Sequence, residues 1–211
     1  MLKEIHELPK AIIDTFRGRM LVEQNIIKMT SVEENLDKFL NANKIIIIGC
    51  GTSWHAGLVG EYLFEDLARI PVEVEYASEF RYRNPIITDK DVVIVISQSG
   101  ETADTLAAIK LAKSKGAFVY GVCNVVGSSI ARETHAGAYT HAGPEIGVAS
   151  TKAFTTQITV LTLIALKLGQ ANKSLSKERF KNYIEKMHLI PKQIQELLSI
   201  EDKIKEIAAI Y

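Results

Sequence analysis

Hydroxyl and amide side chains cluster at residues 97–102, Ser-Gln-Ser-Gly-Glu-Thr, directly after an apolar segment. A helical pattern begins next, so unpaired N–H groups and the positive end of a helix dipole would lie beside this cluster and attract phosphate. Ser97, Gln98, Ser99 and Thr102 could donate hydrogen bonds to such an anion. The alternative is an ordinary helix cap, but a cap needs a single such side chain.

A second loop, Gly-Cys-Gly-Thr-Ser at 49–53, follows four consecutive isoleucines. Thr52 and Ser53 offer donors where the next helix would start. The loop half-matches the dinucleotide fingerprint G-x-G-x-x-G, and Glu75 stands at a suitable distance for the acidic residue of that motif. Trp54 replaces the third glycine and would obstruct the close strand–helix packing, so a nicotinamide-dependent enzyme is the weaker alternative.

A third loop spans residues 143–154, Gly-Pro-Glu-Ile-Gly-Val-Ala-Ser-Thr-Lys-Ala-Phe. Around Val148 and Ser150, backbone carbonyls and one hydroxyl could face a ligand just before a helix. Glu145 could orient sugar hydroxyls and Lys152 could pair with a carboxylate, or the two could pair with each other. The sequence leaves these alternatives open.

The cysteines and histidines indicate neither a disulfide nor a metal site. Cys50 is expected to line the ligand site, because no base can be placed beside it, and Cys123 is expected to be structural. The two cysteines are far apart and lack CxxC spacing, which favours a reducing, cytoplasmic location. The remaining candidates, His55, His135 and His141, lack metal-ligand spacing, so we expect no bound metal.

Hydrophobic patterning predicts alternating strands and helices. The expected strands are 44–49, 72–76, 91–96, 117–122 and 137–140, and the expected helices between and after them are 54–68, 77–82, 102–115, 128–132 and 151–168, the last stopped by Gly169. This alternation predicts an α/β fold, a three-layer, doubly wound sandwich around a five-stranded parallel sheet. Right-handed crossovers would bring the three polar loops to one edge of the sheet.

Additional helices are expected at both ends of the chain. The N-terminal part should form a helix over 8–30 and a short one over 32–41, and 171–211 should form two helices separated at Pro191. We therefore divide the chain into N-terminal helices (1–43), a binding domain (44–170) and C-terminal helices (171–211). The last residues carry no stop signal, so we expect a piece of a longer protein.

Composition limits the classes of partner. The 211 residues contain 25 Lys and Arg against 25 Asp and Glu. This balance argues against nucleic-acid binding. No apolar run approaches the roughly 20 residues that a membrane-spanning helix needs, and the N-terminus does not resemble a secretory signal.

Together, three motifs resemble the SIS (sugar isomerase) domain family, and within it the first SIS domain of isomerizing glutamine–fructose-6-phosphate aminotransferases. They are GCGTS at 49–53, ISQSGETADT at 96–105 and EIGVASTKAFTTQ at 145–157. The stretch KEIHELPKAIIDTFRGR at 3–19 also looks like the start of that isomerase region. The resemblance covers essentially the whole chain.

The resemblance implies a sugar-phosphate ligand and no cofactor. Phosphate contacts would fall on Ser53, Ser97, Gln98, Ser99 and Thr102, and sugar contacts on Cys50, Thr52, Val148 and Ser150. In that family the proton-transfer base, the ring-opening His and the Schiff-base Lys lie in or after a second SIS domain. The fragment is therefore expected to be inactive alone, and to work with a glutaminase domain and a second SIS domain, as a homodimer. The alternative is a stand-alone SIS sensor of sugar phosphates.

Overall fold

A five-stranded parallel sheet forms the centre of the protein in the computed structural model, which describes all of residues 1–211. The strands are β3 (Ile45–Gly49), β4 (Val72–Tyr76), β5 (Val92–Ser97), β6 (Phe118–Cys123) and β7 (Ala136–Tyr139). Their spatial order is β4-β3-β5-β6-β7, with every pair parallel. The predicted α/β sheet is confirmed.

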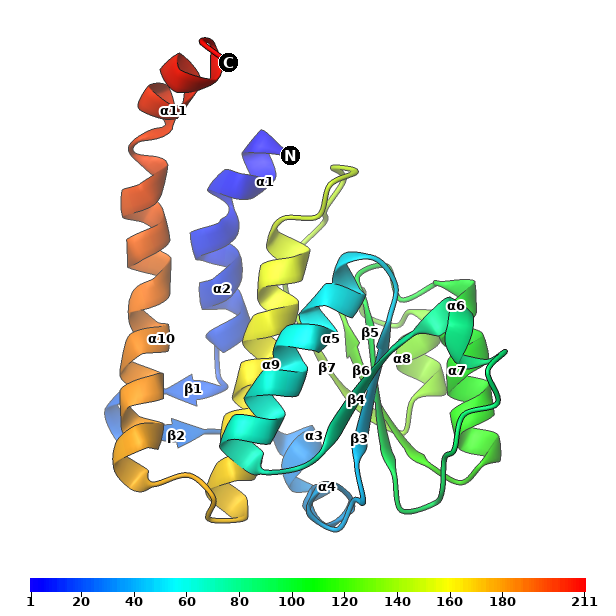
Figure 1. Cartoon of the computed structure of the whole chain (residues 1–211). Coiled ribbons are helices and arrows are strands. Elements are labelled where there is room, and N and C mark those ends of the chain that lie inside the picture. Colours follow the sequence, from blue (N-terminus) through cyan, green and yellow to red (C-terminus); the bar gives the residue numbers. More distant parts are fainter.

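Helices cover both faces of this sheet and give the three layers expected (Figure 1). One face carries α5 (Thr52–Leu63), which continues into the π-helical turn η2 (Phe64–Ala68), and α9 (Lys152–Ala171). The other face carries α6 (Ala77–Phe80), α7 (Ala103–Ser114) and α8 (Ser129–Glu133).

The uninterrupted isoleucine run of β3 has a direct structural reason. Ile45 and Ile47 pack into the core on the α5–α9 side, together with Leu161 of α9. Ile46 and Ile48 pack into the second core, with Ala108 of α7. Because successive side chains of a strand point to opposite faces, a strand buried on both sides needs an apolar residue at every position.

The strand order of the sheet reverses at β3, because β4 and β5 are placed on opposite sides of it. The chain first adds β4 to one side of β3, then crosses back to place β5 on the other side. The carboxyl ends of β3 and β5 are thus neighbours whose following helices, α5 and α7, lie on opposite faces. Such a switch point leaves a crevice where ligands bind in open α/β sheets.

The N-terminal part differs from the single helix predicted over 8–30, and that prediction is wrong beyond Phe16. Two helices, α1 (Leu2–His6) and α2 (Leu8–Phe16), are followed by a small antiparallel hairpin of β1 (Met20–Leu21) and β2 (Ile26–Ile27) joined by the 3-10 turn η1 (Val22–Gln24). Gly18 and Asn25 have left-handed backbones, with φ of 71° and 51°, which a right-handed helix cannot accommodate.

The short helix predicted over 32–41 is also divided. It consists of α3 (Thr30–Glu33) and α4 (Leu36–Leu40), with Asn35 between them in a non-helical conformation.

The predicted break at Pro191 is wrong as well. Helix α10 (Lys177–Leu198) runs through Pro191, and the chain breaks instead near Ser199 before α11 (Glu201–Ala208). Pro191 is buried in the packing of α10, so the fold keeps the helix although proline has no N–H to donate to the carbonyl four residues earlier.

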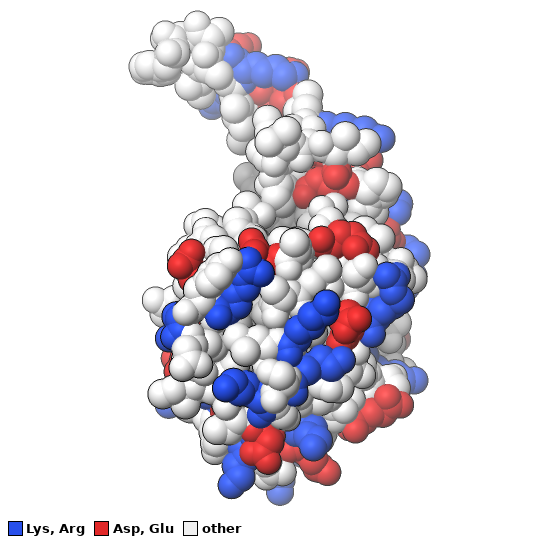
Figure 2. All heavy atoms as spheres, turned by 90° about the vertical axis from the view of Figure 1, so that its right-hand side faces the viewer, with Lys and Arg blue, Asp and Glu red and all other residues white.

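Lys and Arg are interspersed with Asp and Glu on the face formed by α6, α7 and α8 (Figure 2). None of the helices combines the length and the apolar character required to cross a membrane.

Helix α9 does not stop at Gly169 as expected but continues to Ala171. Gly169 is required there by close packing: a Cβ would lie 2.3 Å from the backbone oxygen of Leu67 in η2. The glycine therefore marks a contact between two helices rather than a helix end.

We predict that Gly169→Ala destabilises the protein by about 1–3 kcal/mol, although alanine is the better helix former, because backbone must move to admit the methyl group. The matched control is Gly60→Ala in α5, where the new Cβ would be 3.1 Å from the flexible ends of Ile47 and Leu161. Urea unfolding of both variants measures the difference. Equal losses would contradict the assigned packing role of Gly169.

Candidate functional site

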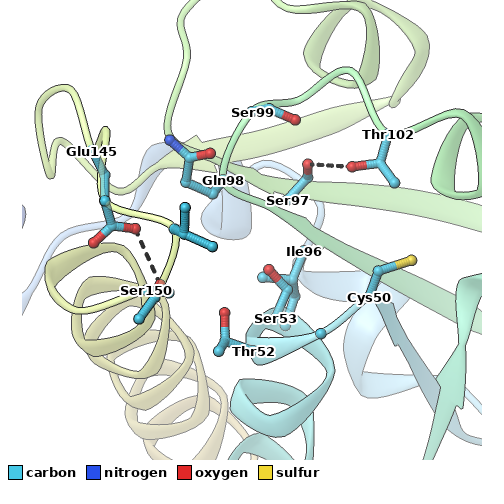
Figure 3. A pocket seen from close by; sticks show the side chains of 14 residues that line it. Cys50, Thr52, Ser53, Ile96, Ser97, Gln98, Ser99, Thr102, Glu145 and Ser150 are labelled. Atoms are coloured by element: carbon cyan, nitrogen blue, oxygen red, sulfur yellow. Dashed lines mark hydrogen bonds between the residues drawn. The ribbon is translucent and has the colours of Figure 1, made fainter. Parts of the chain in front are cut away.

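A cavity of about 580 Å³ lies at the carboxyl edge of the sheet, at the switch point between β3 and β5 (Figure 3). Every residue predicted above to contact the ligand lines it. The lining consists of Cys50, Gly51, Thr52, Ser53, Ile96, Ser97, Gln98, Ser99, Thr102, Glu145, Gly147, Val148, Ala149 and Ser150. The three polar loops therefore meet, as the parallel topology required. The role of these residues in binding stays a prediction.

The loop after β3 turns tightly into α5. A Cβ at Gly49 would lie 2.9 Å from the backbone nitrogen of Trp54, and Gly51 has a left-handed φ of 54°. This turn places Thr52 and Ser53 in the first turn of α5, with their hydroxyls on the pocket side (Figure 3). Trp54 is directed elsewhere and stacks on Tyr76.

The loop after β5 is held by its own side chains. Ser97 is buried, and its Oγ accepts a hydrogen bond of 2.9 Å from the backbone N–H of Gly100. The same oxygen lies 3.4 Å from Oγ1 of Thr102, and Oγ of Ser99 accepts from the N–H of Glu101. Gly100 has a left-handed φ of 69°. The result is a compact turn that brings several hydroxyls to one wall of the cavity.

Helix α7 begins without a side-chain cap, so the simple-cap alternative does not describe this loop. The backbone N–H groups of Gln98, Ser99 and Thr102 find no acceptor within the chain. Unpaired N–H groups at a helix start carry partial positive charge and are suited to an anion. No Lys, Arg or His lines the cavity, so dipoles and neutral donors would have to meet an anionic charge.

Helix α9 differs because a carboxylate already occupies its N-terminus. Oε1 of Glu145 accepts hydrogen bonds from the backbone N–H of Thr151 at 2.8 Å and of Ala153 at 3.2 Å. The Ser150 hydroxyl donates to the other oxygen of the carboxylate at 3.1 Å (Figure 3). The positive end of the α9 dipole is thereby neutralised. Of the three helices that begin at this cavity, α5 and α7 therefore have N-termini without a side-chain cap, and an anion could lie against these two.

The pairing of Glu145 with Lys152, which the sequence left open, is not formed. Lys152 is buried, and its Nζ pairs with the carboxylate of Glu7 in the N-terminal segment. Glu145 acts instead as the cap of α9.

Gln157 lies in the third motif, but its residue type and spacing indicate no role for it. Gln157 is buried in α9, and its Nε2 donates a hydrogen bond of 3.0 Å to Oγ of Ser53. Ser53 accepts this bond, so its own hydroxyl proton is free to be donated into the cavity. The two residues are 104 positions apart, and no local pattern indicates such a contact.

The two cysteines occupy different surroundings. Cys50 is partly exposed and lines the cavity, whereas Cys123 is buried at the end of β6. Burial raises the pKa of the Cys123 thiol to about 11. Glu75, the residue considered for a nicotinamide cofactor, pairs with Arg83 and does not line the cavity.

We predict that iodoacetamide at pH 8 alkylates Cys50 and spares Cys123 in the folded protein, because only a thiolate reacts and the Cys123 thiol is both inaccessible and protonated. In urea both cysteines should react at similar rates. Mass spectrometry of tryptic peptides identifies the modified residue. Rapid alkylation of Cys123 before unfolding would contradict the structure.

The chain is similar to known proteins in sequence and in structure. The family described as SIS domain matches residues 38–167. The glutamine–fructose-6-phosphate aminotransferase [isomerizing] of Bacteroides thetaiotaomicron is 56% identical over 211 residues, which is 100% of this chain and 34% of that protein. The enzyme of the same name from Chlorobaculum tepidum is 57% identical over 208 residues, covering 99% of this chain and 34% of the relative.

A solved structure shares the fold. The C-terminal domain of glucosamine-fructose-6-phosphate aminotransferase from Francisella tularensis superimposes with a TM-score of 0.92 at 37% identity, covering 99% of this chain and 58% of that one. The chain thus spans about a third of the length of the curated relatives described above. On the motifs, the sheet and the family match, the chain belongs to the SIS domain family.

Proposed function

We propose that this chain is the sugar-phosphate-binding SIS domain of an isomerizing glutamine–fructose-6-phosphate aminotransferase, and that it binds fructose 6-phosphate and glucosamine 6-phosphate. The parent enzyme would make glucosamine 6-phosphate from fructose 6-phosphate and glutamine. A glutaminase domain, a second SIS domain and a homodimeric, cytoplasmic assembly belong to the same proposal. Its support is the cavity described above, together with the names of relatives similar along the whole chain.

The observation that carries the proposal is the uncapped start of α7 at the switch point. Free N–H groups, Ser97, Ser99 and Thr102 converge on one wall of the cavity, and Ser53 offers its hydroxyl from α5. These donors suit the three terminal oxygens of a phosphate ester. The opposite wall, from Glu145 to Ser150, is then in place for the sugar.

Chemical turnover is assigned elsewhere in the parent enzyme. The cavity is lined by no His and no Lys, and its single carboxylate, Glu145, has its oxygens engaged by the start of α9. The site offers no evident general base and no amine for a Schiff base. This chain would grip the phosphate and orient the sugar while other parts of the enzyme transform it.

Calorimetry tests this function directly. Fructose 6-phosphate and glucosamine 6-phosphate should bind the full chain with measurable heat at millimolar concentrations, whereas free fructose should give none because the phosphate supplies most of the contacts. A folded sample that shows no phosphate-dependent heat would refute the proposal.

A charge placed in the phosphate loop should abolish binding. In Ser99→Asp the new carboxylate would face the phosphate, and repulsion between like charges at about 4 Å lowers affinity by about a hundredfold or more. The matched control is Ser176→Asp, a serine that caps the distant helix α10 and that aspartate can replace. The control should keep both fold and affinity. Unchanged affinity in Ser99→Asp would reject the role given to this loop.

A further inference from the structure

The cavity wall from Glu145 to Ser150 is a loop without apolar anchors. Ile146 is 88% exposed and Val148 is 107% exposed, and the loop contains no helix or strand. Loops of this kind are mobile unless hydrogen bonds hold them. The position of this wall must therefore depend on its polar contacts.

One of those contacts comes from the N-terminal helix α1. Oε1 of Glu4 accepts hydrogen bonds from the backbone N–H of Ile146 at 2.6 Å and of Gly147 at 2.9 Å. Gly147 lets the two segments approach, since a Cβ there would lie 2.5 Å from the Glu4 carboxylate. The bond to Gly147, followed by that to Ile146 and by the pairing with the Met1 ammonium 3.0 Å away, lowers the pKa of Glu4 to about 2, so the side chain is an anion at neutral pH.

A second contact reaches the end of the loop from α2. Glu7, the residue before α2, pairs with the buried Nζ of Lys152, the first residue of α9. Lys152 would be a buried cation without this carboxylate, which is costly. Glu4 thus holds the middle of the loop, and Glu7 holds the helix residue that follows the end of the loop.

Helix α1 depends on the loop in return. Glu4 is its one buried residue, and Leu2 is 54% exposed, so α1 has little apolar packing of its own. A buried carboxylate is tolerated only while it is hydrogen-bonded. Figure 1 shows α1 and the loop before α9 projecting side by side above the sheet.

We propose that Glu4 and Glu7 are positioning residues for the sugar-facing loop, so that docking of α1 and binding of the sugar phosphate favour each other. The inference rests on the proposed function and adds a way for the N-terminal segment to control it. Coupling of this kind is reciprocal: if a docked α1 tightens ligand binding, the ligand must stabilise the docked α1 by the same factor.

Glu4→Ala in the full chain tests the inference. Amide hydrogen exchange at Ile146 and Gly147, followed by NMR, should become at least about tenfold faster, because both N–H groups lose their acceptor. Affinity for fructose 6-phosphate in calorimetry should fall about tenfold, within the usual range of coupling between sites. Inorganic phosphate should still shift the Ser99 and Gly100 amides at the wild-type concentration, since the phosphate wall is untouched.

Asp14→Ala is the matched control. It also removes a carboxylate from the N-terminal segment, but Asp14 pairs only with Lys10 and Arg17. Exchange and affinity should stay at wild-type values in this variant. Glu4→Gln, which keeps an oxygen acceptor without the charge, should give an intermediate loss and serves if Glu4→Ala folds poorly.

The outcomes separate the two proposals. If wild type binds fructose 6-phosphate and both Glu4 variants bind it equally well, the coupling is refuted and the proposed function stands. If wild type does not bind the ligand, the proposed function fails, and the coupling fails with it. A parallel loss of phosphate and sugar-phosphate binding in Glu4→Ala would indicate general disruption and overturn the positioning role.

Discussion

The site depends on one topological constraint, the adjacency of the carboxyl ends of β3 and β5. Because β4 and β5 lie on opposite sides of β3, the helices that follow β3 and β5 diverge to opposite faces of the sheet. Their first turns face a common crevice, neither helix has a side-chain cap, and at the start of α7 the backbone N–H groups of Ser99 and Thr102 have no acceptor in the chain. A positive potential is built in this way without a single cationic side chain. The glycines of both loops, their hydroxyls and the buried Gln157 refine this arrangement rather than create it.

The sheet and the polar loops of the site could be predicted from the sequence, because the patterns that indicate them are local. The isoleucine run of β3 and the hydroxyl cluster at 97–102 each carry their meaning within a few residues, and parallel topology then brings the loops together. The predicted helix over 8–30 failed for an equally local reason, the left-handed backbones of Gly18 and Asn25, whose residue types permit that conformation without demanding it. The predicted break at Pro191 was wrong for a non-local reason: tertiary packing maintains the helix through a residue that disfavours helix formation.

Contacts made across the fold could not be predicted in this manner. Gln157 reaches Ser53 over 104 positions, and Glu4 reaches Ile146 over 142. Neither residue stands out by type or spacing, because a glutamine in a helix and a glutamate near the N-terminus usually face solvent. Their roles follow only from burial combined with a hydrogen-bond partner in a cavity loop.

The carboxylates around the cavity also determine how an anion can lie in it. Glu145 is compensated by the start of α9, Glu7 by Lys152 and Glu4 by two loop amides. Each negative charge thus has its own donors on the side of the cavity formed by the third loop, and none of those donors remains for a phosphate. On the other side, the start of α7 keeps backbone N–H groups without an acceptor, and α5 offers the Ser53 hydroxyl. Under the proposed function, the charges around the cavity would orient a phosphate ester: its anionic end would be drawn to the β3–β5 crevice, and its neutral chain would face the loop next to the three carboxylates.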